Sequence, residues 1–238
     1  MRLANGSHHP RSVFQVLLGL LAWPVIAAGA GEDARLEGYR HPAGFQVEIV
    51  ASEPQVINPG SMTFGPDGRL YVIEWRPGGG PNDRIQALAD TDHNGSFETA
   101  TTYLDNLELP AGLLFWDGWT YLTLDHDVVR WRDRDGDGNF EERQTLVSGF
   151  GNDNSHHRVS GMALGPDGWL YLTTGDSDAH AQGSDGSTAT VLRCGGVFRC
   201  RPDGSRLEVV AFGMRNPWGN VGFDNALRIF HTDNDNEG

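Results

Sequence analysis

The chain has 238 residues, which is enough for one large domain or two small ones. Its formal net charge is −14 and all 18 basic residues are arginine, which disfavours nucleic acid as a partner. The same acidic balance disfavours strong binding to an anionic membrane surface. Glycine is frequent, with 32 residues, and no long stretch after residue 30 has helical periodicity, so we expect short strands joined by turns.

Residues 1–30 have the features of an export signal. Arg2 and Arg11 are the only charges, Val13 to Ile26 is an apolar run, and Ala28-Gly29-Ala30 offers small residues for cleavage. The run is short for a membrane span, which needs roughly 20 residues. We therefore expect a signal peptide and an exported protein in the periplasm or cell envelope. An uncleaved membrane anchor is the alternative.

The chain after residue 30 contains a repeat with a period of 50 residues. Gly65-Pro66-Asp67-Gly68 recurs as Gly165-Pro166-Asp167-Gly168, and Asp117 belongs to a degenerate copy between them. The aspartates of the three copies are at positions 67, 117 and 167, 50 residues apart in both steps. Each copy stands between two apolar segments, which predicts a β-hairpin. A fourth, weaker copy runs from Val221 to Phe230.

Two more strands are expected after each of the first three hairpins. The predicted third strands are Arg84 to Leu88, Val128 to Trp131 and Gly196 to Arg201, and the predicted fourth strands are Phe97 to Leu104, Phe140 to Val147 and Arg206 to Phe212. Four strands in about fifty residues are typical of one propeller blade. A β-sandwich whose segments are similar by accident is the alternative.

The sequence therefore predicts an all-β protein, a β-propeller of four-stranded blades. The blades are expected near residues 52–105, 106–150 and 151–214, with a partial blade at 215–238 and an N-terminal strand from Gly44 to Ala51. This makes an incomplete arc of about three and a half blades within a propeller domain at 31–238. Because such an arc leaves two sheet edges bare, we expect the chain to be a fragment of a longer propeller.

Two aspartate-rich turns share the pattern D-x-D-x-[ND]-G-x-F-E. Oxygen ligands at positions 1, 3, 5 and 9 with glycine at position 6 fit a compact Ca²⁺ loop. The predicted ligands are Asp90, Asp92, Asn94 and Glu98 in the first loop and Asp133, Asp135, Asp137 and Glu141 in the second. The alternative is a pair of solvated turns whose charges face water.

Cys194 and Cys200 are the only cysteines. On one extended strand they would lie about 20 Å apart, too far for a disulfide. Gly195-Gly196 could turn the chain back, so a disulfide stays open. The sequence has no C-x-x-C-H motif and therefore no c-type haem site of its own.

His156 and His157 stand just before the third hairpin. An imidazole at the end of a propeller channel can act as a general base, because its unperturbed pKa is near neutrality. Hydrogen bonding within the loop is the alternative role for the pair.

Several of these pieces resemble the quinoprotein glucose/sorbosone dehydrogenase family, which depends on pyrroloquinoline quinone (PQQ). They are Gly44 to Val50 followed by Met62 to Val72, Gly165 to Asp176, Arg199 to Ser205, and Ala211 to Gly219. Their order and spacing are also similar. Within that family the chain looks most like the membrane-bound dehydrogenase domain of exported bacterial proteins.

The resemblance implies a six-bladed propeller that binds PQQ with Ca²⁺ and oxidises a sugar or an alcohol. The family's general base is a histidine eight residues before the first glycine of the G-P-D-G turn, which here is His157, with His156 in a supporting position at the cofactor. The family's Arg-Asn before proline contacts the quinone, and here it is Arg215 and Asn216. The Arg215 guanidinium would stabilise charge on a quinone oxygen. Residue type alone would make this an ordinary turn after a strand.

The resemblance also implies a small sugar or alcohol substrate and allows a cytochrome c as electron acceptor. Two segments depart from the family. Pro110-Ala111 stands where the family has a glutamine that touches the quinone, and His231 to Glu237 lacks the Gly-Pro of its calcium-bearing segment.

Two other classes of function stay open. A metal-dependent hydrolase of the lactonase type would need ligands from several blades, for which Glu74, Asn154 and Asp176 are candidates. A non-catalytic binding propeller in an envelope assembly would need neither a quinone nor a metal.

Overall fold

The computed structural model describes residues 34–78, 81–151 and 156–234. The predicted signal peptide at 1–30 and the candidate ligand Asn154 lie outside these residues. The chain divides into two compact units, residues 1–48 and 49–238. The described part of the first unit contains one 3-10 turn, Ala34–Leu36. Within the described ranges, no helix has the length and apolar character needed to cross a membrane.

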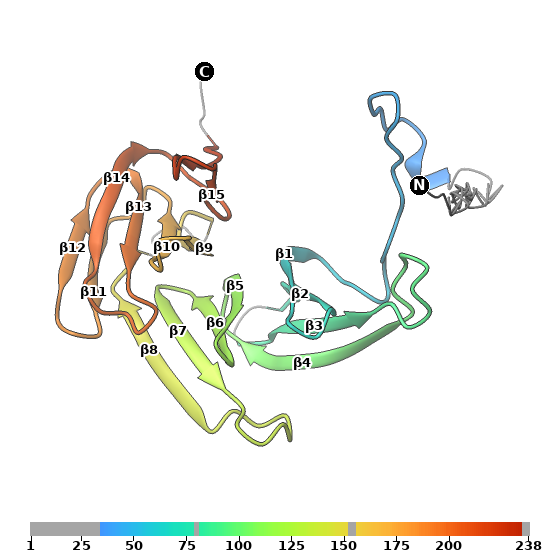
Figure 1. Ribbon diagram of the computed structural model, residues 1–238, viewed down its shortest axis with the longest axis horizontal. Helices are drawn as coiled ribbons and strands as arrows, with labels where there is room; N and C mark the ends of the chain where they lie inside the picture. The colour runs from blue at the N-terminus through green and yellow to red at the C-terminus, as the bar shows by residue number, and fades with distance from the viewer. Residues whose placement is uncertain (1–33, 79–80, 152–155, 235–238) are drawn as a thin grey trace, which may run out of the picture. The chain divides into compact units, whose positions relative to one another are not determined.

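The second unit begins with a four-stranded antiparallel sheet (Figure 1). Its strands, in spatial order, are β1 (Pro59–Phe64), β2 (Leu70–Glu74), β3 (Asp83–Ala89) and β4 (Thr99–Leu107). The Gly-Pro-Asp-Gly turn joins β1 to β2, with Gly68 at a φ of 80°, which favours glycine. Asp67 stabilises the turn by accepting hydrogen bonds from the Tyr71 hydroxyl at 2.9 Å and the Arg69 backbone N–H at 3.1 Å.

The second sheet has six strands, two more than the sequence predicts. They are β5 (Pro110–Trp116), β6 (Trp119–Leu124), β7 (Asp127–Arg132), β8 (Glu142–Ser148), β11 (Ala179–Gly183) and β12 (Thr188–Val191), in the order β12-β11-β8-β7-β6-β5. The β11–β12 hairpin comes from a later part of the chain and pairs with β8. Its signal in the sequence is weak, because the side chains that β11 buries are only Ala179 and Ala181.

The third sheet again has four strands. They are β9 (Val159–Leu164), β10 (Leu170–Thr174), β13 (Gly195–Cys200) and β14 (Glu208–Met214), in the order β14-β13-β10-β9. The fourth copy of the repeat forms a short hairpin of β15 (Gly222–Phe223) and β16 (Ile229–Phe230). The all-β fold predicted from the sequence is confirmed.

The predicted N-terminal strand from Gly44 to Ala51 is wrong, because no strand precedes β1 in the described chain. Phe45 and Val50 of this segment are 69% and 40% exposed. One backbone hydrogen bond from the first sheet reaches it, from the Phe97 N–H to the Val50 carbonyl at 3.1 Å. An alternating apolar pattern forms a strand only where a ladder of such bonds is available.

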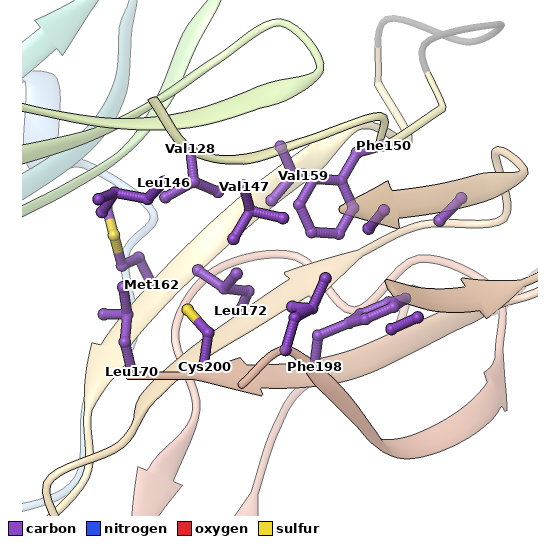
Figure 2. Packing of buried hydrophobic residues seen from close by; sticks show 14 of the residues in the cluster. Val128, Leu146, Val147, Phe150, Val159, Met162, Leu170, Leu172, Phe198 and Cys200 are labelled. Atoms are coloured by element: carbon purple, nitrogen blue, oxygen red, sulfur yellow. The ribbon is translucent and has the colours of Figure 1, made fainter. Parts of the chain in front are cut away.

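The three sheets pack face to face in chain order, and their first strands β1, β5 and β9 are neighbours. Between the first and second sheets, Tyr71, Ile73 and Ile85 pack against Leu122 and Val129. The larger cluster lies between the second and third sheets (Figure 2). It includes Val128, Leu146, Val147, Met162, Leu170, Leu172, Phe198 and Cys200. Successive sheets with adjacent inner strands are the arrangement of propeller blades.

Strand β9 lies unusually close to the segment that follows β14. The Thr173 hydroxyl donates to the Gly219 carbonyl at 2.9 Å, and the Met162 N–H donates to Asn220 Oδ1 at 2.9 Å. A Cβ on Gly161 would lie 1.7 Å from the Gly219 carbonyl oxygen. Glycine is therefore required at position 161 for this approach.

The Gly161→Ala variant is expected to lose about 2 kcal/mol or more of unfolding free energy, because the added methyl group must push two backbone segments apart. Urea unfolding followed by circular dichroism measures this loss. Gly222→Ala is the matched control, since no atom lies within 4 Å of its Cβ position. Equal losses in the two variants would contradict the close contact.

Both cysteines are free thiols in the structure. Cys200 is fully buried in the cluster between the second and third sheets, whereas Cys194 is partly exposed (Figure 2). Burial raises the pKa of the Cys200 thiol to about 12. Because the thiolate is the reactive form, Cys200 should be inert in the folded protein.

A thiol-reactive dye at pH 8 is therefore expected to label one cysteine in the native protein and two after denaturation. Mass spectrometry of peptides should place the native label on Cys194. Native labelling of Cys200, or no free thiol after denaturation without a reductant, would contradict this arrangement.

Candidate active site

His157 and Asp176 form a hydrogen-bonded pair at one end of the third sheet. His157 precedes β9 and Asp176 follows β10, and these antiparallel neighbours bring the two residues to the same end. His157 Nδ1 is hydrogen-bonded to Asp176 Oδ1. His157 is only 7% exposed, while the Asp176 side chain is 38% exposed. Because an ionised carboxylate can only accept, Nδ1 donates the proton of this bond, and a neutral imidazole in this tautomer has its lone pair on Nε2.

Asn216 lies beside this pair. A Cβ on Gly175 would lie 2.7 Å from both the His157 Cβ and Asn216 Oδ1, so glycine between β10 and Asp176 allows the three residues to meet. Asn216 is 4% exposed, and its Nδ2 donates to the His156 carbonyl at 3.2 Å. Its Oδ1 is buried and has no hydrogen-bond partner among the residues that the structure describes. A buried acceptor without a partner is costly, which suggests that a ligand or water completes it.

Asp233 holds the backbone of the Arg215-Asn216 segment. Its two carboxylate oxygens accept the Asn216 N–H at 2.7 Å and the Arg215 N–H at 3.1 Å. The Arg215 guanidinium donates to the Asn234 carbonyl at 3.0 Å, and the Asn234 N–H returns a bond to the Asn216 carbonyl at 3.2 Å. These bonds fix the conformation of the turn after β14 that carries Arg215 and Asn216.

Asn216 borders a cavity of about 340 Å³, which we call the site cavity, while His157 and Asp176 lie behind Asn216 and are not part of its lining. It is lined by Pro59, Gly60, Trp75, His156, Asn216, Trp218 and Asn234. The Trp75 and Trp218 rings meet edge to face with centroids 5.9 Å apart. The first and third sheets thus both contribute to its wall.

A buried arginine adds positive charge near the site cavity. Arg158 is 3% exposed, and its guanidinium carbon lies 5.7 Å from the centroid of the Trp75 ring. Burial lowers the pKa of Arg158, while the carboxylates of Asp125 and Asp83 oppose that shift. An arginine stays charged in proteins, so Arg158 places a buried positive charge near the site cavity.

Two other candidate positions are occupied by structural contacts. Glu74 is fully buried and accepts hydrogen bonds from Arg84 Nε at 2.5 Å and the Ile57 N–H at 2.8 Å. Both of its oxygens are therefore used, which weakens its candidacy as a hydrolase metal ligand. At the position of the family glutamine, the Pro110 carbonyl accepts the Trp75 Nε1–H at 2.6 Å.

Both aspartate-rich turns gather their acidic side chains. In the first, Asp90, Asp92 and Glu98 each place an oxygen within 4.8 Å of the others, and in the second Asp133, Asp135, Asp137 and Glu141 do the same. Asn94 Oδ1, in the first turn, instead accepts the Ser96 N–H at 2.7 Å. Oxygen atoms at this spacing fit the 2.3–2.6 Å bonds of Ca²⁺.

Backbone N–H groups arrange these carboxylates and keep them ionised. Asp133 accepts from Gly138 at 2.9 Å and Gly136 at 2.7 Å, which lowers its pKa. Glu98 accepts from the N–H and hydroxyl of Thr91, which lowers its pKa. The turns connect β3 to β4 and β7 to β8, at the end of the sheets opposite to the site cavity. Their role is therefore separate from His157.

Residues 32–238 match the family described as Domain of unknown function (DUF7133). The chain belongs to that family. None of the curated proteins compared with this DUF7133 chain is similar enough to match it.

Solved structures with the same fold include the PQQ domain of pyranose dehydrogenase from Coprinopsis cinerea in its holo form. That structure is 16% identical, with a TM-score of 0.53 over 75% of this chain and 44% of its own length. A protein classed by its family as a gluconolactonase is 19% identical, with a TM-score of 0.50 over 77% and 58% of the two chains. The gluconolactonase XC5397 from Xanthomonas campestris is 17% identical, with a TM-score of 0.47 over 79% and 58%.

The DUF7133 chain thus spans about half the length of the structures it matches. The likeness establishes a β-propeller fold, here as an incomplete arc. This fold is shared by a PQQ-domain dehydrogenase and by a gluconolactonase-like protein. The fold alone therefore does not determine the reaction, which depends on the residues of the site.

The structure brings His156, His157, Arg215 and Asn216 together, and it shows supporting residues that the sequence analysis did not connect with them. Asp176 was considered only as a metal ligand, although a Gly-Asp pair directly after a strand is a recognisable position for a partner of His157. Trp218 belongs to the Arg-Asn-Pro-Trp segment, which is part of the resemblance to the quinoprotein family. Trp75 and Asp233 had no signal in the sequence, since both act through contacts across the fold.

Proposed function

We propose that this chain forms part of an exported, quinone-dependent oxidoreductase that oxidises a sugar or an alcohol. The observation that carries the proposal is the hydrogen bond between buried His157 and partly exposed Asp176, next to Asn216, which lines the site cavity and whose Oδ1 has no partner among the described residues. A histidine base beside an unsatisfied acceptor and an arginine is suited to removing a proton from a bound hydroxyl.

The residues around the site cavity fit pyrroloquinoline quinone in hydrogen bonding and charge. Asn216, whose Oδ1 has no partner among the described residues, would offer its side-chain amide to the polar edge of this cofactor. Arg215 and Arg158 bring positive charge toward a cofactor that bears several carboxylates. Trp75 and Trp218 supply an apolar wall for a flat ring system. His156, also on the wall, is expected to support the cofactor.

His157 would act as the general base. Because Asp176 accepts the Nδ1 proton, Nε2 can take the proton of the substrate hydroxyl, and the carboxylate then stabilises the imidazolium. When bound, PQQ would accept the hydride from the carbon that carries this hydroxyl. The Arg215 guanidinium would favour the negative charge that develops on the quinone. Oxidation of the hydroxyl to a carbonyl leaves one proton on His157.

The proposal also covers the cofactor, the substrate, export and the electron acceptor. The structural likeness to the PQQ domain of a pyranose dehydrogenase supports the cofactor and a sugar as substrate. Residues 1–30 would direct export, and a cytochrome c would receive the electrons. Because the chain spans about half the length of its structural neighbours, these properties are proposed for the protein of which this arc is a part.

The His157→Ala variant is expected to reduce an artificial dye at least about a hundredfold more slowly than the unaltered protein, because the general base is removed. The assay contains purified protein, PQQ, Ca²⁺ and a panel of sugars and alcohols. Asp176→Asn should also lower kcat, because an amide can donate to Nδ1 and leave the proton on Nε2.

His180→Ala is the matched control, since His180 is exposed on β11 and should leave the rate unchanged. Unchanged dye reduction in His157→Ala would refute the assignment. Hydrolysis of a lactone without quinone would favour the lactonase-type alternative instead. If neither activity is found and fluorescence quenching detects no PQQ binding, a binding propeller is the better description.

We also propose that the two aspartate-rich turns bind Ca²⁺ as structural ions. The second turn should bind more tightly, because it gathers four carboxylates whereas the first gathers three. An ion that binds only the folded state raises its stability by mass action. Adding Ca²⁺ after chelation should therefore raise Tm, and Asp137→Asn should reduce that rise more than Asp92→Asn does.

Asp203→Asn is the matched control for this experiment. Asp203 lies in a similar turn, where it accepts the Ser205 N–H at 3.0 Å, but it belongs to neither acidic group. The substitution should leave the Ca²⁺-dependent rise in Tm unchanged, whatever it does to the starting Tm. A rise that survives both Asp137→Asn and Asp92→Asn would place the binding elsewhere.

A further inference from the structure

A second cavity lies between the first and second sheets, and we call it the aromatic cavity. Its volume is about 350 Å³. The side chains that line it include Tyr71, Tyr103, Phe115, Trp116, Asp117 and Thr120. It also touches Pro66 in the β1–β2 turn, whereas Trp75 of the site cavity follows the other end of β2. The two cavities are therefore at opposite ends of the sheets and are separate.

The aromatic cavity exists where the fifty-residue repeat is imperfect. The β1–β2 turn places Asp67 under Tyr71, and the β9–β10 turn places Asp167 under the hydroxyl of Tyr171 at 2.8 Å. The β5–β6 connection is a two-residue turn instead, in which Asp117 has a φ of 51°. Among the described residues this shorter turn has no counterpart of the partly buried aspartate–tyrosine bond, and Asp117 and Gly118 of the turn line the cavity.

Trp116 offers a free aromatic face to the aromatic cavity. Its side chain is 41% exposed, and it has no ring, cation or hydrogen-bond partner among the residues that the structure describes. Trp119, its partner across the hairpin, differs because the guanidinium groups of Arg130 and Arg132 each lie 4.3 Å from its ring. A large exposed aromatic side chain in a concave wall is typical of a binding site.

The remaining walls combine apolar and polar groups. Tyr71 packs against Phe115 and Tyr103 with ring centroids 4.6 Å and 4.8 Å away, which makes that wall rigid. The Tyr103 hydroxyl and Thr120 Oγ1 are hydrogen-bonded at 2.6 Å, and Asp117 presents a solvent-exposed carboxylate. The cavity thus holds a flat apolar surface beside groups that donate and accept hydrogen bonds.

The charged groups around the aromatic cavity favour a neutral ligand. An anion is disfavoured by Asp117 and by the net charge of −14. A cation is disfavoured by the guanidinium groups of Arg130 and Arg132, each 4.3 Å from the ring of Trp119, which also lines the cavity. A neutral ligand with an apolar face and several hydroxyl groups avoids both penalties, and a pyranose ring has this chemistry.

We propose that the aromatic cavity binds a neutral saccharide, with one face of the ring against Trp116 and its hydroxyl groups toward Asp117. The proposal is independent of the quinone chemistry proposed for the site cavity. It gives this propeller a second contact with carbohydrate, one that would hold the protein on a glycan without reacting with it.

Calorimetry with D-glucose and maltose as probes tests the proposal on the whole protein without PQQ. Binding is expected in the millimolar range, and Trp116→Ala should weaken it about tenfold, which corresponds to roughly 1.4 kcal/mol. Asp117→Asn should weaken it several-fold without disturbing the fold, because asparagine suits the positive φ at this turn. Trp116→Phe should keep part of the affinity and shows that loss in the alanine variant is not unfolding.

His157→Ala is the control that separates the two sites, since binding at the aromatic cavity should survive it. Loss of saccharide binding in His157→Ala with full binding in Trp116→Ala would overturn the proposal and place the sugar at the site cavity. Choline serves as a cationic probe for the same aromatic walls. Choline binding without saccharide binding, or no binding of either probe, would also overturn it.

Discussion

The close approach of β9 to the segment after β14 is the contact on which the candidate site depends. It requires glycine at position 161 and is fastened by the bond from Thr173 to the Gly219 carbonyl. This contact sets His157, which leads into β9, beside Asn216, which lies three residues before Gly219. A site assembled from residues next to the two edge strands of a sheet is as rigid as the backbone packing that holds those strands.

Charged groups lie at both ends of the sheets. Arg158 and Arg215 lie near the site cavity, together with the carboxylates of Asp176 and Asp233. The acidic turns lie at the other end, where backbone N–H groups lower the pKa of Asp133. The proposed cofactor and the proposed Ca²⁺ ions would therefore occupy different surroundings.

The aromatic cavity lies at the degenerate copy of the fifty-residue repeat. Asp67 and Asp167 perform the same structural task in the first and third sheets, while Asp117 at the equivalent spacing belongs to a shorter turn and faces solvent. Asp117 belongs to the degenerate copy of the repeat, and its turn borders the aromatic cavity in place of forming the aspartate–tyrosine bond of the other two copies. Departures from a repeat are where function can be added without loss of the shared core.

The sequence by itself determined the all-β fold, the hairpins and the gathering of the acidic turns, because these depend on local turn chemistry and alternation that repeat every fifty residues. It was wrong about the strand from Gly44 to Ala51 and did not anticipate the β11–β12 hairpin. In both cases the outcome depends on whether a distant edge offers a ladder of hydrogen bonds. Only the tertiary structure decided that Asp176 orients His157 and that Trp75 meets Trp218, because residues far apart in the chain become neighbours only when the sheets pack.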